Sequence, residues 1–169
     1  DRDHPTPDVV LQTTPAAGEA LTGTVVARIS VESSSMFLTQ VAADSGSCSI
    51  PNDDVVVSTL TTNQAVVCSS RTVSSSSTGL VYLVAGRADR FEAQAGIPAG
   101  EDTGASARLF ISVEGQGVFD QVITWNQLVP LNIDLRGKTR IEFWVTPPDQ
   151  TDYSQAGVDL ALLDPTLFG

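Results

Sequence analysis

Few side chains in this sequence are suited to covalent chemistry. His4 is the only histidine in 169 residues, and it lies in the proline-rich leader. This excludes a Ser-His-Asp triad, a Cys-His pair within the folded body and a histidine-rich metal site. Carboxylates, hydroxyls and backbone groups remain, and they suit binding of a sugar or a hard cation better than nucleophilic catalysis. We therefore expect no catalytic residue, no cofactor and no enzymatic activity.

Cys48 and Cys68 are the only thiols. They show no C-x-x-C spacing, so a redox or zinc motif is absent. Two interpretations remain: a disulfide between them, or two buried free thiols in a reducing compartment. We expect the disulfide, which closes a loop of about 20 residues and stabilises the fold by about 3 kcal/mol in the chain-entropy model. It implies an oxidising compartment, and we expect a secreted or extracytoplasmic protein.

Aromatic side chains beside polar groups are the candidates for ligand binding. Trp125 adjoins Asn126 and Gln127, and Tyr153 follows Asp152. Each of these segments combines a ring with amides or a carboxylate, which is the mixture that a pyranose needs. Trp144 lies on the polar face of an alternating stretch, where a ring is a platform for a sugar. The competing interpretation is that Trp144 packs beneath the N-terminal arm or against a second sheet, and that Trp125 and Tyr153 are ordinary loop residues.

Acidic residues dominate the charge of the chain. Nine Lys and Arg oppose 20 Asp and Glu, for a net charge of −11. A nucleic-acid partner and an anionic membrane surface both require a basic patch, so we expect neither. Asp53-Asp54 and Glu101-Asp102 carry oxygens that suit Ca²⁺. They lack the D-x-D-x-D-G spacing, so solvated surface charge is the competing interpretation and we assign no metal ligand.

Period-two alternation of apolar and polar residues indicates the elements that must position these side chains. It is clearest over residues 90–95, 107–113, 140–146 and 158–162. Further β-rich runs at 21–32, 36–42, 64–68, 79–85, 118–124 and 129–135 bring the count to about ten short strands. Such a series predicts a β-sandwich or a β-barrel. The side chains expected to face inward are those of Phe91, Leu109, Ile111, Ile141, Phe143, Val145, Leu160 and Leu162.

The chain divides into an arm and a body in this interpretation. Residues 1–20 hold three prolines among Thr, Asp and Ala, which is typical of an extended linker. We expect residues 21–169 to form a single domain and the arm to contact a protein partner. No apolar run approaches the ~20 residues that span a bilayer, so we expect no membrane insertion in this segment.

The order of segments in the second half resembles a known family. Gly79–Gly86 precedes Arg90-Phe91-Glu92-Ala93-Gln94-Ala95-Gly96, an acidic loop, the hairpin around Glu114-Gly115-Gln116-Gly117 and the late strand 139–146. This order resembles the novel putative carbohydrate-binding module (NPCBM) family over about 36–165. The resemblance implies a jelly-roll β-sandwich, so the fold we expect is an all-β jelly-roll β-sandwich of about ten short strands. It also implies an accessory role in binding galactose-type sugars, near the segment that contains Asp152 and Tyr153.

Two departures from that family bear on function. The family's late segment usually carries an Asp-His pair and a Trp at the sugar site, and residues 152–160 contain neither His nor Trp. The usual N-G-W-G loop is replaced by the region around Cys48. Two hypotheses follow. The first is a non-catalytic, extracellular module that binds a glycan or cell-surface polysaccharide weakly, as an accessory part of a larger protein. The second is a structural or sensory ectodomain, such as a membrane-kinase sensor or a surface-assembly subunit, with a degenerate sugar site.

Overall fold

The computed structural model describes residues 9–14, 26–30, 34–46, 48–70, 79–85, 87–148 and 157–169. It forms two units, residues 1–34 and residues 35–169. In the first unit, strand β1 (Val9–Thr14) pairs antiparallel with β2 (Val26–Ser30). The run expected at 21–32 thus includes a strand, and its partner lies within residues 1–20. The division into a linker or arm at residues 1–20 and a single domain at residues 21–169 stays a prediction.

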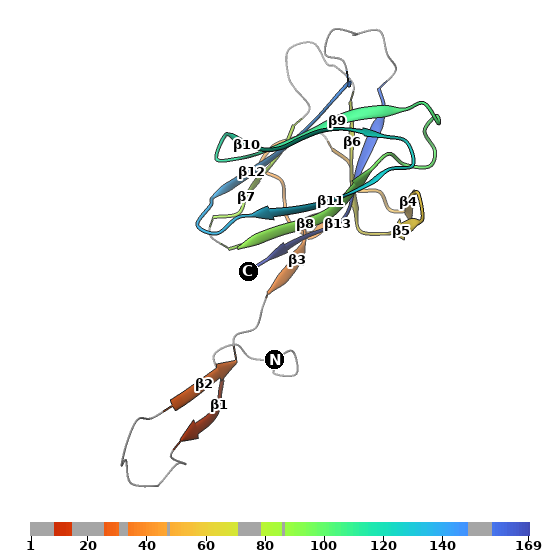
Figure 1. The fold of residues 1–169 in the computed structure, drawn as a ribbon. Helices are drawn as coiled ribbons and strands as arrows, with labels where there is room; N and C mark the ends of the chain where they lie inside the picture. The colour runs from red at the N-terminus through yellow and green to blue at the C-terminus, as the bar shows by residue number, and fades with distance from the viewer. Residues whose placement is uncertain are drawn as a thin grey trace. The chain divides into compact units, whose positions relative to one another are not determined.

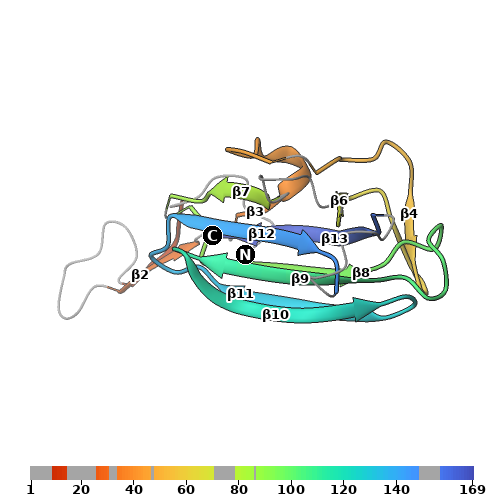
Figure 2. The same cartoon turned by 90° about the horizontal axis from the view of Figure 1, so that it is seen from above.

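The second unit is a β-sandwich of two sheets, which Figures 1 and 2 show as two layers. The four-stranded sheet has the order β10 (Gln116–Thr124), β9 (Ser106–Val113), β12 (Arg140–Thr146) and β7 (Gly79–Leu83). The five-stranded sheet has the order β11 (Leu128–Asp134), β8 (Arg90–Gly96), β13 (Asp159–Phe168) and β3 (Ser35–Phe37), with β6 (Ala65–Ser69) also paired to β13. All pairs in both sheets are antiparallel. The expected all-β sandwich is therefore confirmed.

The inner faces of the two sheets form one core. All eight side chains expected to face inward are at most 2% exposed. Phe143 of the four-stranded sheet meets Phe91 of the five-stranded sheet edge to face, with ring centroids 5.1 Å apart. Tyr82 packs against the same Phe143 ring at 6.3 Å. Burial raises the pKa of Tyr82 to about 12, because a buried phenolate is poorly solvated.

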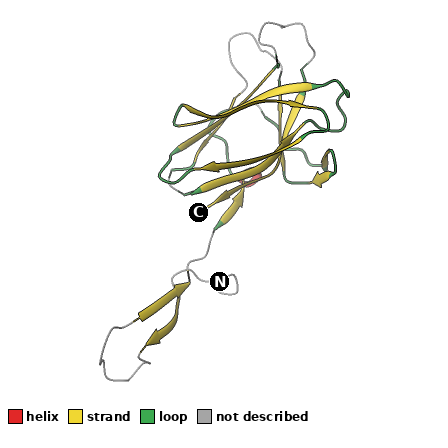
Figure 3. Ribbon diagram, in the orientation of Figure 1, coloured by secondary structure: helices red, strands yellow, loops and turns green. Residues whose placement is uncertain are grey.

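Some elements differ from the sequence expectation. The run at 36–42 is a strand only to Phe37, and a short 3-10 turn, η1 (Leu38–Gln40), follows with Leu38 fully buried. Figure 3 shows this turn among strands. A small hairpin of β4 (Val55–Val57) and β5 (Leu60–Thr62) was not expected.

The last strand, β13, extends beyond the expected 158–162 and passes through Pro165 to Phe168. Its pairing with β8 shifts register between Leu163 and Thr166, and Asp164 has φ +47°. Proline has no N–H to give to a ladder, so a bulge is where a strand accommodates it. The bulge lets the strand continue where the sequence pattern breaks.

The disulfide is confirmed between Cys48 and Cys68, with an S–S distance of 2.02 Å. It holds the segment before β4 against β6. Next to it, Ser49 and Val67 exchange two backbone hydrogen bonds of 2.8 Å. The bond therefore fixes an irregular stretch of chain to the five-stranded sheet.

Removing the Phe143 ring tests the core. We expect Phe143→Ala to lower the free energy of unfolding by about 3–5 kcal/mol, because it opens a cavity between the sheets. Leu83→Ala is the control, since Leu83 is 56% exposed on β7; it should change stability little. The measurement is urea denaturation followed by fluorescence. Equal small losses in both variants would contradict the assignment of Phe143 to the core.

Thiol labelling tests the disulfide. Mass spectrometry of protein alkylated without reductant should show no modified cysteine, because the chain has only Cys48 and Cys68 and both are bonded. After reduction, two labels should appear and the free energy of unfolding should fall by about 3 kcal/mol. Two labels before reduction would instead indicate free thiols and a reducing compartment.

Candidate functional site

The strand register gathers several strand termini at one end of the sandwich, which we call the loop end. β10 finishes at Thr124, opposite the first residue of β9, and β12 finishes at Thr146, opposite Arg108. β13 begins there, with Asp159 opposite Ser69 at the end of β6. Ligand-binding residues concentrate on connections held by a rigid scaffold. The loop end is therefore the first place to look for a site.

Trp125 lies at the loop end directly after β10. Its backbone N–H donates to Ala105 O at 2.9 Å, and it bridges to Ile97 at the end of β8. The side chain is partly buried and packs against the main core. Its Nε1 is buried, and no residue in the described part of the chain accepts its hydrogen. The ring is therefore packed against the core, and its N–H is buried without an acceptor in that part of the chain.

The two residues after Trp125 present amides. Asn126 is exposed and has φ +63°, a conformation that Asn tolerates better than most residues. Gln127 turns back, and its Oε1 accepts from the N–H and the hydroxyl of Thr124 at 3.2 and 3.3 Å. The turn is thus closed by its own side chains, and Asn126 is the amide that faces solvent.

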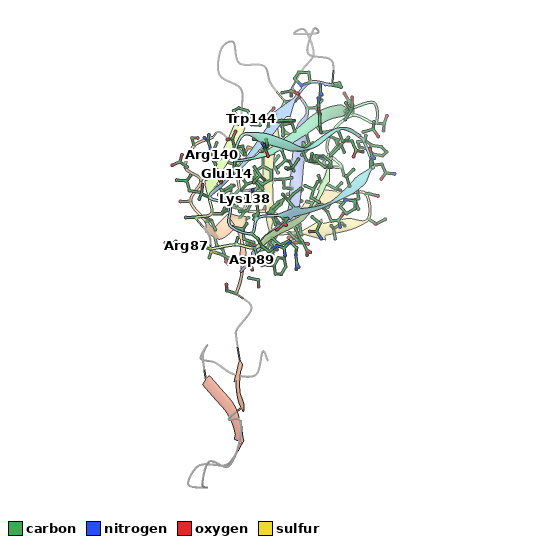
Figure 4. All side chains as sticks on the ribbon, turned by 60° about the vertical axis from the view of Figure 1, so that its left-hand side comes forward. Arg87, Asp89, Glu114, Lys138, Arg140 and Trp144 are labelled. Carbon is green, nitrogen blue, oxygen red and sulfur yellow. A yellow bond between two sulfur atoms is a disulfide. The ribbon has the colours of Figure 1, made fainter. Side chains whose placement is uncertain are left out.

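Trp144 lies on the outer face of the four-stranded sheet, because its neighbours Phe143 and Val145 face the core. It is partly buried. The register places it between Gly79 of β7 and Phe110 of β9. A Cβ at Gly79 would come within 2.5 Å of the indole ring, so the ring lies directly over that glycine. Figure 4 shows Trp144 above Arg140, toward the end of β12 that finishes at Thr146.

The structure does not bring the two tryptophans to one surface. Trp125 packs against the core between the sheets, whereas Trp144 is on an outer face. Asp152 and Tyr153 lie outside the described residues. The roles of all four in binding stay a prediction.

The two acidic segments show no metal site. Glu101 Oε1 accepts the backbone N–H of Asp159 at 3.1 Å and ties the β8–β9 connection to the start of β13. Within the residues that the structure describes, no three Cys, His, Asp or Glu side chains gather as a metal site would require. In the same part of the chain, no helix is both long and apolar enough to cross a membrane.

Charged residues mark the opposite end of the sandwich, where Figure 4 labels Glu114, Lys138 and Arg140 close together. Glu114 Oε1 accepts the N–H of Thr139 at 2.5 Å, its hydroxyl at 2.9 Å and the N–H of Arg140 at 3.1 Å. The backbone N–H of Thr139, its hydroxyl and then the N–H of Arg140 together lower the pKa of Glu114, with Lys138 adding to the effect. This carboxylate fastens the β9–β10 hairpin to the β11–β12 connection, which is a structural role.

Sequence reasoning missed a groove on the outer face of the five-stranded sheet. It has a volume of about 480 Å³ and runs across β11, β8 and β13. Gln94 and Asn132 are among its lining residues. Alternation shows that these side chains share an outer face, but only the register between strands shows that they meet.

The fold of the second unit is like that of carbohydrate-binding modules of known structure. Over 79% of this chain and 99% of its own length, CBM51 from Clostridium perfringens GH95, solved with methyl-galactose, superposes with a TM-score of 0.60 at 16% identity. CBM51-2 of C. perfringens ZmpB, solved with GlcNAc and together with INT domains, gives 0.64 at 14% identity over 86% of this chain and 34% of that one. The ZmpB structure that includes the M60 catalytic domain gives 0.61 at 13% identity over 94% and 19%.

The sequence profile of the NPCBM/NEW2 domain matches residues 71–161. The chain belongs to this family, as the order of its strands suggested. A search of curated proteins found no match. The chain spans 34% and 19% of the two ZmpB chains, which are larger proteins with further domains.

Neutralising Glu114 tests its structural role through pH. The folded-state pKa lies below the ordinary value of 4.5, so the carboxylate stabilises the fold above that value and loses this contribution as pH falls through the folded pKa. We expect Glu114→Gln to be less stable than the wild type at pH 7, and the difference to shrink below pH 4.5. The measurement is thermal unfolding across pH 2–7.

Asp53→Asn is the matched control for Glu114→Gln. Asp53 is exposed and accepts no side-chain hydrogen bond within the described residues. Its replacement should change the thermal stability at pH 7 little. A pH-independent loss in Glu114→Gln would contradict the role of the charge.

Proposed function

We propose that this chain is a non-catalytic module that binds glycan at its loop end, through Trp125 together with Asp152 and Tyr153. Membership of the NPCBM/NEW2 family supports the class of function. The likeness to a module solved with methyl-galactose, which extends over 99% of that module, supports the scaffold. A sugar with an exposed galactose or GlcNAc unit is the first ligand to test.

The geometry around Trp125 is the observation that carries the proposal. The ring packs against the core and the backbone N–H of Trp125 is bonded to Ala105 O, so little side-chain freedom is lost when a ligand binds. Asn126 offers an exposed amide beside the ring, whereas the indole N–H is itself buried. A fixed apolar platform with adjacent donors and acceptors is what the C–H faces and hydroxyls of a pyranose require.

The setting that we propose is outside the cytoplasm, as an accessory module of a larger protein. The Cys48–Cys68 bond is consistent with an oxidising compartment. In the ZmpB structure, modules of this fold accompany an M60 catalytic domain in one chain. We propose that residues 1–20 connect the module to such a neighbour or to a protein partner.

Weak affinity is part of the proposal. The segment 152–160 lacks the His and the Trp that the resemblance led us to expect. Compared with a site that has this His and Trp, the site here makes fewer polar contacts and has one ring fewer. We therefore expect a Kd of about 1 mM, or a binding free energy of about −4 kcal/mol. A module of this strength works where many copies of a sugar are present on one surface.

The two indole N–H signals offer a direct test, because the chain has only two tryptophans. In ¹⁵N-labelled protein titrated with methyl-galactoside and then with GlcNAc, we expect the Trp125 indole signal to shift with a Kd near 1 mM. The Trp144 indole should move little, since it lies on an outer face. Trp144→Phe removes one signal and assigns the other.

The variants must keep the core intact. Trp125 packs against the core, so Trp125→Phe is preferable to Ala: it keeps a ring and removes the N–H donor. Combined with Tyr153→Ala, it should abolish the sugar-induced shifts of the backbone amide signals around residues 124–127, while the melting temperature changes by a few degrees at most. Binding that persists in the double variant would place the site elsewhere. No response to any neutral glycan would favour a structural or sensory ectodomain.

A further inference from the structure

The outer face of the five-stranded sheet is covered only in part. The β4–β5 hairpin packs over one part, where Val55 and Val57 join Ala161 and Leu163 in a second small core. Gly96 makes room for it, because a Cβ there would lie 2.4 Å from Val57 Cγ1. Beyond the hairpin, the same face holds the groove of about 480 Å³.

The pairing of β11, β8 and β13 arranges the residues of the groove in rows that run across the three strands. Pro130, Gln94 and Leu163 form the row beside the hairpin, and Asn132, Glu92 and Thr166 form the next. The first row is apolar at both sides of a central amide, and the second is polar throughout. Leu163 is fully buried beneath the hairpin, so the surface of the first row comes from Pro130 and Gln94.

The third row adds an aromatic ring. Phe168 of β13 is opposite Arg90 of β8, and the Arg90 guanidinium lies 4.7 Å from the ring centroid. Arg90 Nε also contacts Glu92 Oε1 at 2.8 Å. The Arg90 guanidinium therefore interacts with both Glu92 and Phe168 of the same sheet. The groove has no unpaired positive charge from this residue.

The bulge in β13 positions a carboxylate at the groove. Asp164 has φ +47°, a left-handed conformation that Asp tolerates better than most residues and that belongs to the bulge. Its N–H donates to Gln64 O at 2.7 Å, and its Oδ1 accepts from the Thr62 hydroxyl at 2.5 Å. The hairpin thus clamps Asp164 from one side, and Oδ2 has no partner among the described residues.

Unused hydrogen-bonding groups remain along the groove. Gln94 makes no side-chain hydrogen bond to any residue that the structure describes, and it is only partly exposed. Asn132 donates to Glu92 Oε1 at 3.3 Å, which leaves its own Oδ1 and a second N–H. Two amides and two carboxylates therefore converge on a space bounded by Pro130 and Phe168.

We propose that this groove is a second binding site, separate from the loop end, and that it takes a neutral saccharide of one or two pyranose rings. Clefts that hold small ligands have volumes of roughly 300–1,000 Å³, and this one falls in that range. Amides and carboxylates are partners for hydroxyls, and Pro130 and Phe168 are surfaces for sugar C–H groups.

Other classes of ligand fit less well. An anionic ligand meets Glu92 and Asp164, and the only cation in the three rows, Arg90, is already paired. A lipid or other hydrophobe would bury those carboxylates without partners, at high cost. A protein interface needs about 800 Å² from each partner, far more than this groove provides.

A second site would change how the module binds polymers. A polysaccharide that contacts both the groove and the loop end binds by two weak contacts at once, and the second is favoured by the high effective concentration that the first creates. Monomeric sugars gain nothing from this effect. The proposal therefore stands whether or not the loop end binds sugar.

The test uses the intact chain labelled with ¹⁵N and three probes: lactose, cellobiose and glucuronate. We expect the two neutral disaccharides to shift the amide signals of Gln94, Asn132 and Thr166 together, and glucuronate to shift them at least fivefold less at equal concentration. Gln94→Ala with Asn132→Ala should weaken binding of the disaccharides about fivefold or more, with an unchanged melting temperature.

A matched pair of amides outside the groove is the control. Gln116 and Asn52 are both exposed, and the double variant Gln116→Ala with Asn52→Ala should bind as the wild type does. Shifts confined to the Trp125 indole and its neighbours would overturn the groove and support the loop end. Shifts confined to the residues of the three rows would support the groove and contradict binding at the loop end. Equal response to glucuronate would overturn the assignment to neutral sugars.

Discussion

The contact of Phe143 with Phe91 across the sandwich sets the orientation of everything else in the second unit. It joins the central strands of the two sheets, with ring centroids 5.1 Å apart. Side chains alternate along a strand, so an inward Phe143 requires an outward Trp144 on β12. An inward Phe91 likewise requires outward Arg90 and Glu92 on β8. A slip of one residue would expose the apolar set of that strand, and the same constraint therefore determines the composition of both outer faces.

The outer faces then differ because different segments cover them. On the five-stranded sheet, the β4–β5 hairpin occupies the part around Gly96 and stops at Asp164. On the four-stranded sheet, Trp144 and Phe110 lie flat over the glycines of the adjacent strands, Gly79 and Gly117. The rings therefore pack over glycines on one face, whereas a separate hairpin covers part of the other face. The groove is the part of the outer face of the five-stranded sheet that the hairpin leaves uncovered.

The sequence was sufficient for the class of fold and for which side of a strand faces the core, because both depend on local alternation. It placed Phe143 inward and Trp144 outward correctly. It did not reveal β4 and β5, since three residues are too few to show a period, nor the passage of β13 through Pro165, since a bulge interrupts the pattern. The meeting of Gln94 with Asn132 depends on pairing between strands 38 positions apart, and single-strand patterns carry no such information.

The distribution of charge explains why neutral ligands suit this surface. Four arginines form ion pairs with carboxylates two residues away or on the neighbouring strand: Arg90 with Glu92, Arg108 with Asp120, Arg136 with Asp134, and Arg140 with Glu142. Each pair neutralises a cation where it arises, so these arginines do not combine into a basic patch, and the excess of 11 negative charges remains. An anionic ligand would be repelled over long range and would have to break an existing pair at close range. A neutral polyol is not repelled and breaks no ion pair. Its hydroxyls replace water as the hydrogen-bond partners of the amides and carboxylates.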